Sequence, residues 1–215
     1  MAGAPVARRL IRRTCVGPRD HGRRMSLARF AQAHAAPGYG YELEGGVIVV
    51  VDVPGLPYAQ IVRTIRLAIE LHMAEHLPPF CFVAGGSEVV IRIPRLQAER
   101  HPDLAIYLTR PPTDADQPWD DWTPEIVIEV VSSSSRTRGY RVKSVDYLAV
   151  GVREYWIVDP LTSSATILTR RGDLWRKRKL SRGGSIRTAL LPEFSLALER
   201  VFASARRRRR SSNGA

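Results

Sequence analysis

The sequence PEIVIEVVSSSS, residues 124–135, places one glutamate inside an otherwise unbroken run of β-branched aliphatic residues. Pro124 bounds the run on one side and four serines bound it on the other, which is typical of a strand buried on both faces of a sheet. Burying a lone carboxylate is costly, so Glu129 must be neutralised, paired with a cation or bound to a metal. Its partners elsewhere in the chain therefore decide the chemistry of this protein.

The chain has 215 residues and a net charge of +12, and 44% of its residues are hydrophobic. This length and composition predict one globular domain, which we place at residues 25–203. Residues 1–24 carry seven arginines and one aspartate, and residues 206–210 are five consecutive arginines. The basic charge is therefore concentrated at the two ends, and the body between them is nearly neutral.

Both ends are expected to lack regular structure. Residues 1–24 form an arginine-rich leader that precedes the first organised element at Met25, and one interpretation places them upstream of the working start codon. Their composition also resembles an organellar transit peptide. Residues 204–215 form a basic tail, which is either simply solvated or binds phosphate backbone without sequence preference.

No apolar run approaches the roughly 18 residues of a membrane span, and the leader lacks the apolar core of a secretory signal. Cys15 and Cys81 are the only cysteines, which gives neither a disulfide framework nor a thiolate metal site. These features favour a cytoplasmic protein with no membrane partner.

Hydrophobic periodicity predicts alternating strands and helices. Residues 41–53 predict a hairpin in which Glu42 and Glu44 share one face, because strand side chains alternate. Residues 57–76 predict a long amphipathic helix that packs on a sheet. The other predicted elements are helices at residues 26–35 and 140–150, strands at residues 80–83, 89–93, 101–108 and 154–159, and a C-terminal hairpin at residues 165–180.

Three acids and one lysine have the chemistry needed for phosphodiester hydrolysis. They are Glu42 in the hairpin, Asp103 at the start of a strand, Glu129 in the buried strand and Lys143 on the following helix. Mg²⁺ takes carboxylate oxygens and keeps several waters, so acids that converge at strand ends predict a magnesium site. The ion lowers the pKa of a bound water, while an ammonium group stabilises the developing charge. By spacing alone, a structural ion pair also explains the buried glutamate.

The segments YELEGGVIVV, HPDLAIYL, PEIVIEVVSSSS and GVREYWIVDP, in this order, resemble the Uma-type restriction endonucleases, bacterial members of the PD-(D/E)XK nuclease superfamily. The resemblance covers residues 25–200. It implies an α/β (mixed α+β) protein with the restriction-endonuclease-like fold, a central mixed β-sheet flanked by helices, here with an added C-terminal hairpin.

The resemblance also implies a Mg²⁺-dependent DNA endonuclease, with Mn²⁺ as a possible substitute. Glu42 matches the acid of the first motif, Asp103 the motif aspartate and Glu129 the acid of the second half. These three residues would hold the ion, and together with Lys143 they form the expected catalytic set.

The sequence departs from the superfamily pattern at three positions. Val131 stands where a lysine follows the second acid by two residues, and Lys143 on the next helix is the expected replacement. Gly139 stands where an acid commonly precedes that lysine by one helical turn. Tyr58 or Ala59 stands where many relatives have a histidine at the start of the long helix.

A competing hypothesis is a catalytically silent module that keeps the fold and binds nucleic acid, or assembles with partners, through its arginine-rich ends. A third is a metal-dependent hydrolase of another phosphoester, because the acids indicate phosphate chemistry more firmly than they indicate DNA. A homodimer is compatible with the nuclease hypothesis, since cutting both strands at once needs two sites.

Overall fold

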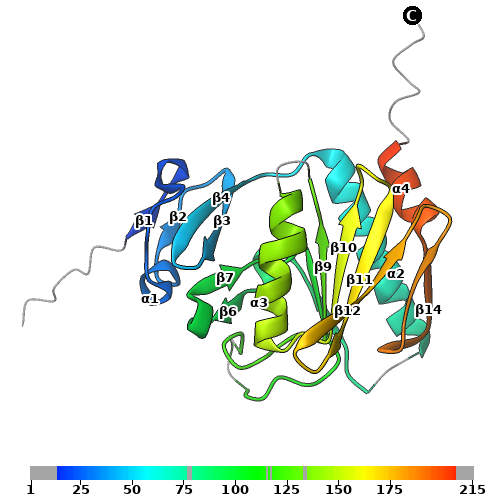
Figure 1. Ribbon diagram of the computed structural model, residues 1–215. Helices are drawn as coiled ribbons and strands as arrows, with labels where there is room; N and C mark the ends of the chain where they lie inside the picture. The colour runs from blue at the N-terminus through cyan, green and yellow to red at the C-terminus, as the bar shows by residue number, and fades with distance from the viewer. Residues whose placement is uncertain (1–13, 77–78, 115, 117, 133–134, 207–215) are drawn as a thin grey trace, which may run out of the picture.

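The computed structural model describes residues 14–76, 79–114, 116, 118–132 and 135–206. A six-stranded sheet with the order β12-β11-β10-β9-β8-β5 forms its centre (Figure 1). In that order the strands are Leu174–Leu180, Ser164–Arg171, Glu154–Asp159, Ile126–Val130, Leu104–Tyr107 and Phe82–Ala84. β9 and β10 are parallel and the other neighbouring pairs are antiparallel, so the predicted mixed sheet is confirmed.

β9 is the strand predicted from residues 124–135, and all five of its residues are buried. It is hydrogen bonded to β8 on one edge and to β10 on the other. Its side chains alternate between two hydrophobic clusters, with Ile126 and Ile128 on one face of the sheet and Val127 on the other. The expectation of a strand buried on both faces is therefore confirmed.

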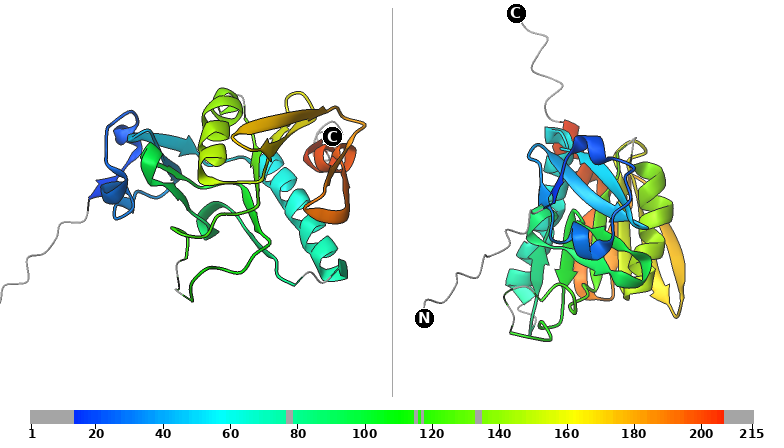
Figure 2. Two further views of the ribbon diagram at one scale, coloured as in Figure 1. Left: turned by 60° about the horizontal axis from the view of Figure 1, so that its bottom comes forward. Right: turned by 90° about the vertical axis from the view of Figure 1, so that its left-hand side faces the viewer.

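Helices cover both faces of the central sheet (Figure 2). Leu56–His76 (α2) and the C-terminal helix Leu198–Arg206 (α4) pack on one face. The other face is covered by Lys143–Val150 (α3), which continues a π-helical turn at Arg138–Val142 (η4) and ends at residue 150, as the predicted helix does. Three isoleucines one turn apart anchor α2 to the sheet: Ile61, Ile65 and Ile69.

The predicted C-terminal hairpin is the β11–β12 pair, and it extends the central sheet to its edge. A second hairpin follows, formed by Ser185–Thr188 (β13) and Leu191–Ala197 (β14), and it leads directly into α4. Its inward-facing side chains join the core on the α2 side of the sheet. The C-terminal third of the chain therefore completes this core.

A second, antiparallel sheet with the order β4-β3-β7-β6 stands beside the first. Its strands are Val47–Asp52, Tyr39–Glu44, Ala98–Arg100 and Ile91–Ile93. β3 and β4 form the predicted hairpin. The short 3₁₀ turns Gly86–Glu88 (η2) and Pro94–Leu96 (η3) connect strands in this region.

The expectation of an unstructured leader is wrong for residues 14–24. Cys15–Val16 (β1) pairs in parallel with His34–Ala35 (β2), and Pro18–Asp20 (η1) follows it. Val16 is buried in one hydrophobic cluster with Leu43 and Ile48 of the β3–β4 hairpin, and this packing holds the segment against the sheet. Residues 1–13 lie outside the described residues.

The helix predicted at residues 26–35 is confirmed only at Leu27–Phe30 (α1). It stops early because the backbone of β2 pairs with β1, and the sequence pattern gave no indication of that partner. At the other end, α4 extends to Arg206 and so enters the expected tail, of which residues 207–215 are not described. No helix in the described part of the chain is long and apolar enough to span a membrane.

Candidate active site

One cleft of about 730 Å³ is lined by all four residues predicted to carry out catalysis. Glu42 comes from β3, Asp103 from the start of β8, Glu129 from β9 and Lys143 from the first turn of α3. The cleft therefore lies where the two sheets and α3 meet. Residues separated by about a hundred positions in the chain are brought together there.

Asp103 and Glu129 are neighbours because of the strand register. Leu104 pairs with Ile128 in the antiparallel β8–β9 ladder, so the preceding Asp103 lies opposite Glu129 on the same face. The backbone around Asp103 is closely packed, since a Cβ on Gly85 would lie 2.0 Å from the Asp103 carbonyl oxygen. Glycine at that position allows the close approach.

Two groups fix the carboxylate of Asp103. The hydroxyl of Tyr58, in the first turn of α2, donates a hydrogen bond to Oδ1, and the backbone N–H of Val130 donates to Oδ2 at 2.7 Å. The resemblance marked Tyr58 only as a departure from an expected histidine, whereas in the structure Tyr58 contacts a candidate catalytic acid.

Two side chains from α3 reach Glu129. Lys143 Nζ and Tyr147 Oη both donate to Glu129 Oε1, each at 2.7 Å. The two donors are one helical turn apart and therefore point the same way. Both hydrogen bonds that the described residues make to this carboxylate end on Oε1.

Val131 and Gly139, two positions at which the sequence departs from the expected pattern, lie close together in the structure. Val131 is buried, and a Cβ on Gly139 would lie 2.6 Å from its Cγ1. The Gly139 carbonyl also accepts a hydrogen bond from Tyr155 at 2.9 Å. There is consequently no room for an acid at position 139, and Lys143 reaches Glu129 from the helix instead.

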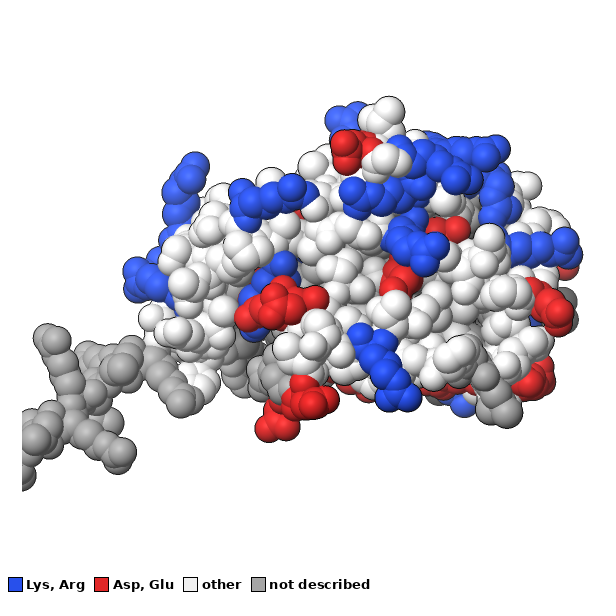
Figure 3. All heavy atoms as spheres, turned by 90° about the horizontal axis from the view of Figure 1, so that it is seen from below, with Lys and Arg blue, Asp and Glu red and all other residues white. Residues whose placement is uncertain are grey.

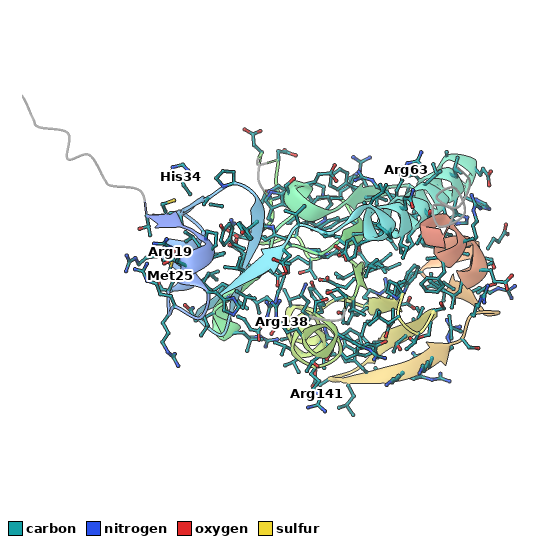
Figure 4. All side chains as sticks on the ribbon, turned by 90° about the horizontal axis from the view of Figure 1, so that it is seen from above. Arg19, Met25, His34, Arg63, Arg138 and Arg141 are labelled. Carbon is teal, nitrogen blue, oxygen red and sulfur yellow. The ribbon has the colours of Figure 1, made fainter. Side chains whose placement is uncertain are left out.

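Glu42 is surrounded by positive charge. Its carboxylate lies 3.0 Å from Lys143 Nζ, 2.6 Å from an Arg138 nitrogen and 3.3 Å from an Arg100 nitrogen. Burial raises the pKa of Glu42, but the charges of Lys143, Arg100 and Arg138 together lower it to about 2. Figure 4 shows Arg138 between the N-terminal strands and α3.

Arg100 and Arg138 are functional candidates that sequence reasoning missed. Arg100 is fully buried, and its guanidinium also contacts Asp146 at 2.5 Å. Both arginines also contact Glu44, which shares the face of Glu42 as predicted. In the sequence, Arg100 lies in a short segment between two predicted strands, and Arg138 lies just before a predicted helix. Neither position indicated a contact with Glu42.

The described residues include no group of three Asp, Glu, His or Cys side chains arranged to hold a metal ion. Lys143 pairs with both Glu42 and Glu129. Asp103 and Glu129 nevertheless fit a hard divalent cation, because they are adjacent carboxylates that line an accessible cleft. The set of three acid ligands stays a prediction, with Asp103 and Glu129 as its central pair.

Asp103 gives the metal-free protein a specific pH dependence. Burial and the neighbouring charge of Glu129 raise the pKa of Asp103 from 3.8 to about 7. A raised acid pKa stabilises the fold below the unfolded pKa, and this contribution is lost as the pH rises through the folded pKa. We expect the free energy of unfolding of the wild type, relative to Asp103→Asn, to fall between about pH 4 and pH 7 in EDTA. Urea unfolding across this range measures the difference, and parallel pH profiles would contradict it.

Comparisons with known proteins agree with this architecture. The Uma2 family model, described as "Putative restriction endonuclease", matches residues 27–199. Among solved structures, the chain is similar to "a putative nuclease belonging to DUF820" from Anabaena variabilis, with 15% sequence identity and a TM-score of 0.68. That match covers 84% of this chain and 99% of the other, and at this identity it shows the fold. No curated protein matches.

Proposed function

The chain belongs to the Uma2 family, and from this premise we propose that it is an endonuclease that hydrolyses DNA phosphodiester bonds with Mg²⁺, for which Mn²⁺ can substitute. The observation that carries the proposal is the pairing of Asp103 and Glu129 on one face of β8 and β9, with Lys143 Nζ 2.7 Å from Glu129. Two adjacent acids and an ammonium group in one cleft are the side chains that this reaction needs.

In this proposal Asp103 and Glu129 would be the central ligands of the divalent cation, with Glu42 as the third predicted ligand. When bound, the ion lowers the pKa of a water and neutralises a phosphate oxygen. The ammonium of Lys143 stabilises the negative charge that develops on the phosphate. Tyr58 and Tyr147 keep the two carboxylates in position through their hydrogen bonds. Glu42 helps to orient Lys143, because its carboxylate lies 3.0 Å from the ammonium that also pairs with Glu129.

Cleavage of supercoiled plasmid DNA tests the proposal. We expect the purified protein to produce nicked DNA in Mg²⁺ or Mn²⁺ and no product in EDTA, because the two acids need a cation to act on phosphate. Linear product at the earliest times would indicate a homodimer that cuts both strands in one encounter. Cleavage that continues unchanged in EDTA would contradict the metal-dependent mechanism.

The silent-module hypothesis gives a different result in the same assay. Arg100, Arg138 and Lys143 already neutralise Glu42, which is what a purely structural ion network would also do. If the protein binds DNA but never cleaves it with any divalent ion, and deletion of residues 206–210 removes binding, the silent module is favoured.

A further inference from the structure

The edge strand β12 carries an uninterrupted run of basic side chains. Residues 170–182 contain seven Lys or Arg and a single Asp. Four of the basic residues are consecutive and exposed on β12: Arg176, Lys177, Arg178 and Lys179. Within the described part of the chain, none of these four takes part in an ion pair, so their charges face solvent.

The summed charge of the body of the chain, which is near zero, gave no indication of this basic surface on β12. Among the described residues, seven acidic side chains are buried, whereas the buried basic side chains are two, Arg100 and Lys143. In the net charge calculated from the sequence, these buried acids offset Lys and Arg side chains that are exposed. The accessible surface is consequently more basic by five charges than that sum indicates, and much of the excess lies on β12.

The strand register separates the four basic residues into two faces. Lys177 pairs with Leu168, whose side chain belongs to the core on the α3 side, and Lys179 follows two positions later on the same face. Arg178 pairs with Ile167, which belongs to the opposite core. The two lysines therefore face the α3 side of the sheet, and Arg176 and Arg178 face away from it.

The two lysines share a face with the candidate active site. Glu129 pairs with Ile157, whose side chain also belongs to the α3-side core. Helix α3 lies between them, because Trp175 of β12 donates to the Ser144 carbonyl at 2.8 Å while Lys143 reaches the cleft. An α-helix is roughly 10–12 Å across, which is less than the width of a DNA duplex.

The outer surface of α3 presents no negative charge that would repel a phosphate backbone. The exposed positions of η4 and α3 are Arg141 and Val145, and Asp146 is buried against Arg100. Seen from below, Lys and Arg side chains gather along the border that carries α3 and β12 (Figure 3). Arg141 on η4 and the lysines of β12 thus place positive charge on both sides of α3.

We infer that Lys177 and Lys179, together with Arg141, bind the phosphate backbone of a DNA duplex next to the strand that enters the cleft. The inference rests on the proposed nuclease function, which supplies DNA as the ligand. Exposed lysines and arginines bind phosphates by releasing condensed counterions, without reading the base sequence. β12 then holds the substrate, and the specificity of the enzyme is determined elsewhere.

An edge strand rich in lysine also has a simpler explanation, since such charges prevent pairing with the edge of another sheet. That role does not depend on which face carries the charge. Phosphate binding beside the cleft does, because only Lys177 and Lys179 share the face of Glu129. The two explanations therefore predict different results for matched substitutions on the same strand.

The test compares Lys177→Gln/Lys179→Gln with Arg176→Gln/Arg178→Gln, both in the full chain with residues 206–210 retained. Each variant loses two positive charges. Fluorescence anisotropy with a labelled DNA duplex in EDTA gives the dissociation constant between about 50 and 200 mM salt. We expect the lysine variant to reduce the slope of log affinity against log salt by about 2 and to bind roughly tenfold more weakly. The arginine variant should keep most of the wild-type slope and affinity.

Equal effects of the two variants would overturn the inference, as would an absence of duplex binding by the wild type. Unchanged affinity combined with oligomerisation of the lysine variant would show that the lysines only protect the sheet edge. Tighter wild-type binding to single-stranded RNA or to anionic vesicles than to duplex DNA would also overturn it. If the lysine variant alone loses affinity but the wild type never cleaves plasmid in Mg²⁺, the binding surface stands and the nuclease proposal fails.

Discussion

Glu129→Gln is expected to reduce metal-dependent DNA cleavage by roughly 10²- to 10³-fold while the protein stays folded. Glutamine has the same shape, and its carbonyl oxygen can accept the hydrogen bonds that Lys143 and Tyr147 donate at 2.7 Å. It lacks the negative charge that a divalent cation requires of its ligand. The measurement is the initial rate of plasmid nicking at saturating Mg²⁺, with circular dichroism to verify the fold.

Glu125→Gln is the matched control for this prediction. Glu125 is also buried and immediately precedes β9, where its carboxylate accepts hydrogen bonds from the Leu108 N–H at 2.7 Å and from the Thr109 hydroxyl at 3.0 Å. Its side chain does not line the cleft, so cleavage should change little. If Glu129→Gln cleaves as fast as Glu125→Gln, Glu129 is not a metal ligand and the buried glutamate is a structural ion pair.

Arg100→Met is expected to lower the free energy of unfolding by about 3–5 kcal/mol. Its guanidinium has no solvent exposure and contacts Asp146, Glu42 and Glu44. Methionine fills similar space but leaves Asp146 and Glu42 as buried carboxylates with less compensating charge, which is the costly way to break a buried ion pair. Equilibrium unfolding in urea at pH 7 measures the loss.

Arg66→Met provides the control, because Arg66 also pairs with two acids but lies at the surface. Its side chain is 34% exposed and contacts Glu70 and Glu88, each at 2.8 Å. Exposed pairs contribute about 1 kcal/mol or less, so this variant should lose little stability. A loss in Arg100→Met no larger than in Arg66→Met would show that the buried network does not hold the two sheets together.

The buried ion network also explains why the cleft keeps its form. Arg100 lies on β7 in the second sheet, while Asp146 lies on α3, which packs on the central sheet. Arg138 of η4 contacts Glu42 and Glu44 of β3 in the same way. These contacts connect the wall that carries Glu42 to the helix that carries Lys143. A loss of Arg100 should therefore loosen the site as well as the fold.

Local sequence patterns predicted the elements whose burial is periodic. β9, α2 and the β3–β4 hairpin were predicted from alternation or helical spacing, which are properties of neighbouring residues. The same patterns failed at residues 14–24 and at the end of α1. There, a two-residue strand is stabilised by a distant segment, and so short an element leaves no periodic signal. The roles of Tyr58 and Arg100 were not predicted for the same reason, since their partners Asp103 and Asp146 are 45 and 46 residues away in the chain.

The sequence by itself determined that a strand at residues 124–135 is buried on both faces and that Glu129 cannot lie there alone, because the cost of burying a carboxylate follows from its immediate neighbours. Only the tertiary structure decided which groups accompany it. The β8–β9 register brings Asp103 beside it, and a helix that begins fourteen positions later supplies Lys143. The tertiary structure also decided which charges are buried and which remain at the surface, and so placed the basic side chains of β12 on the outside. Charge exposure depends on contacts between distant segments, which no local pattern contains.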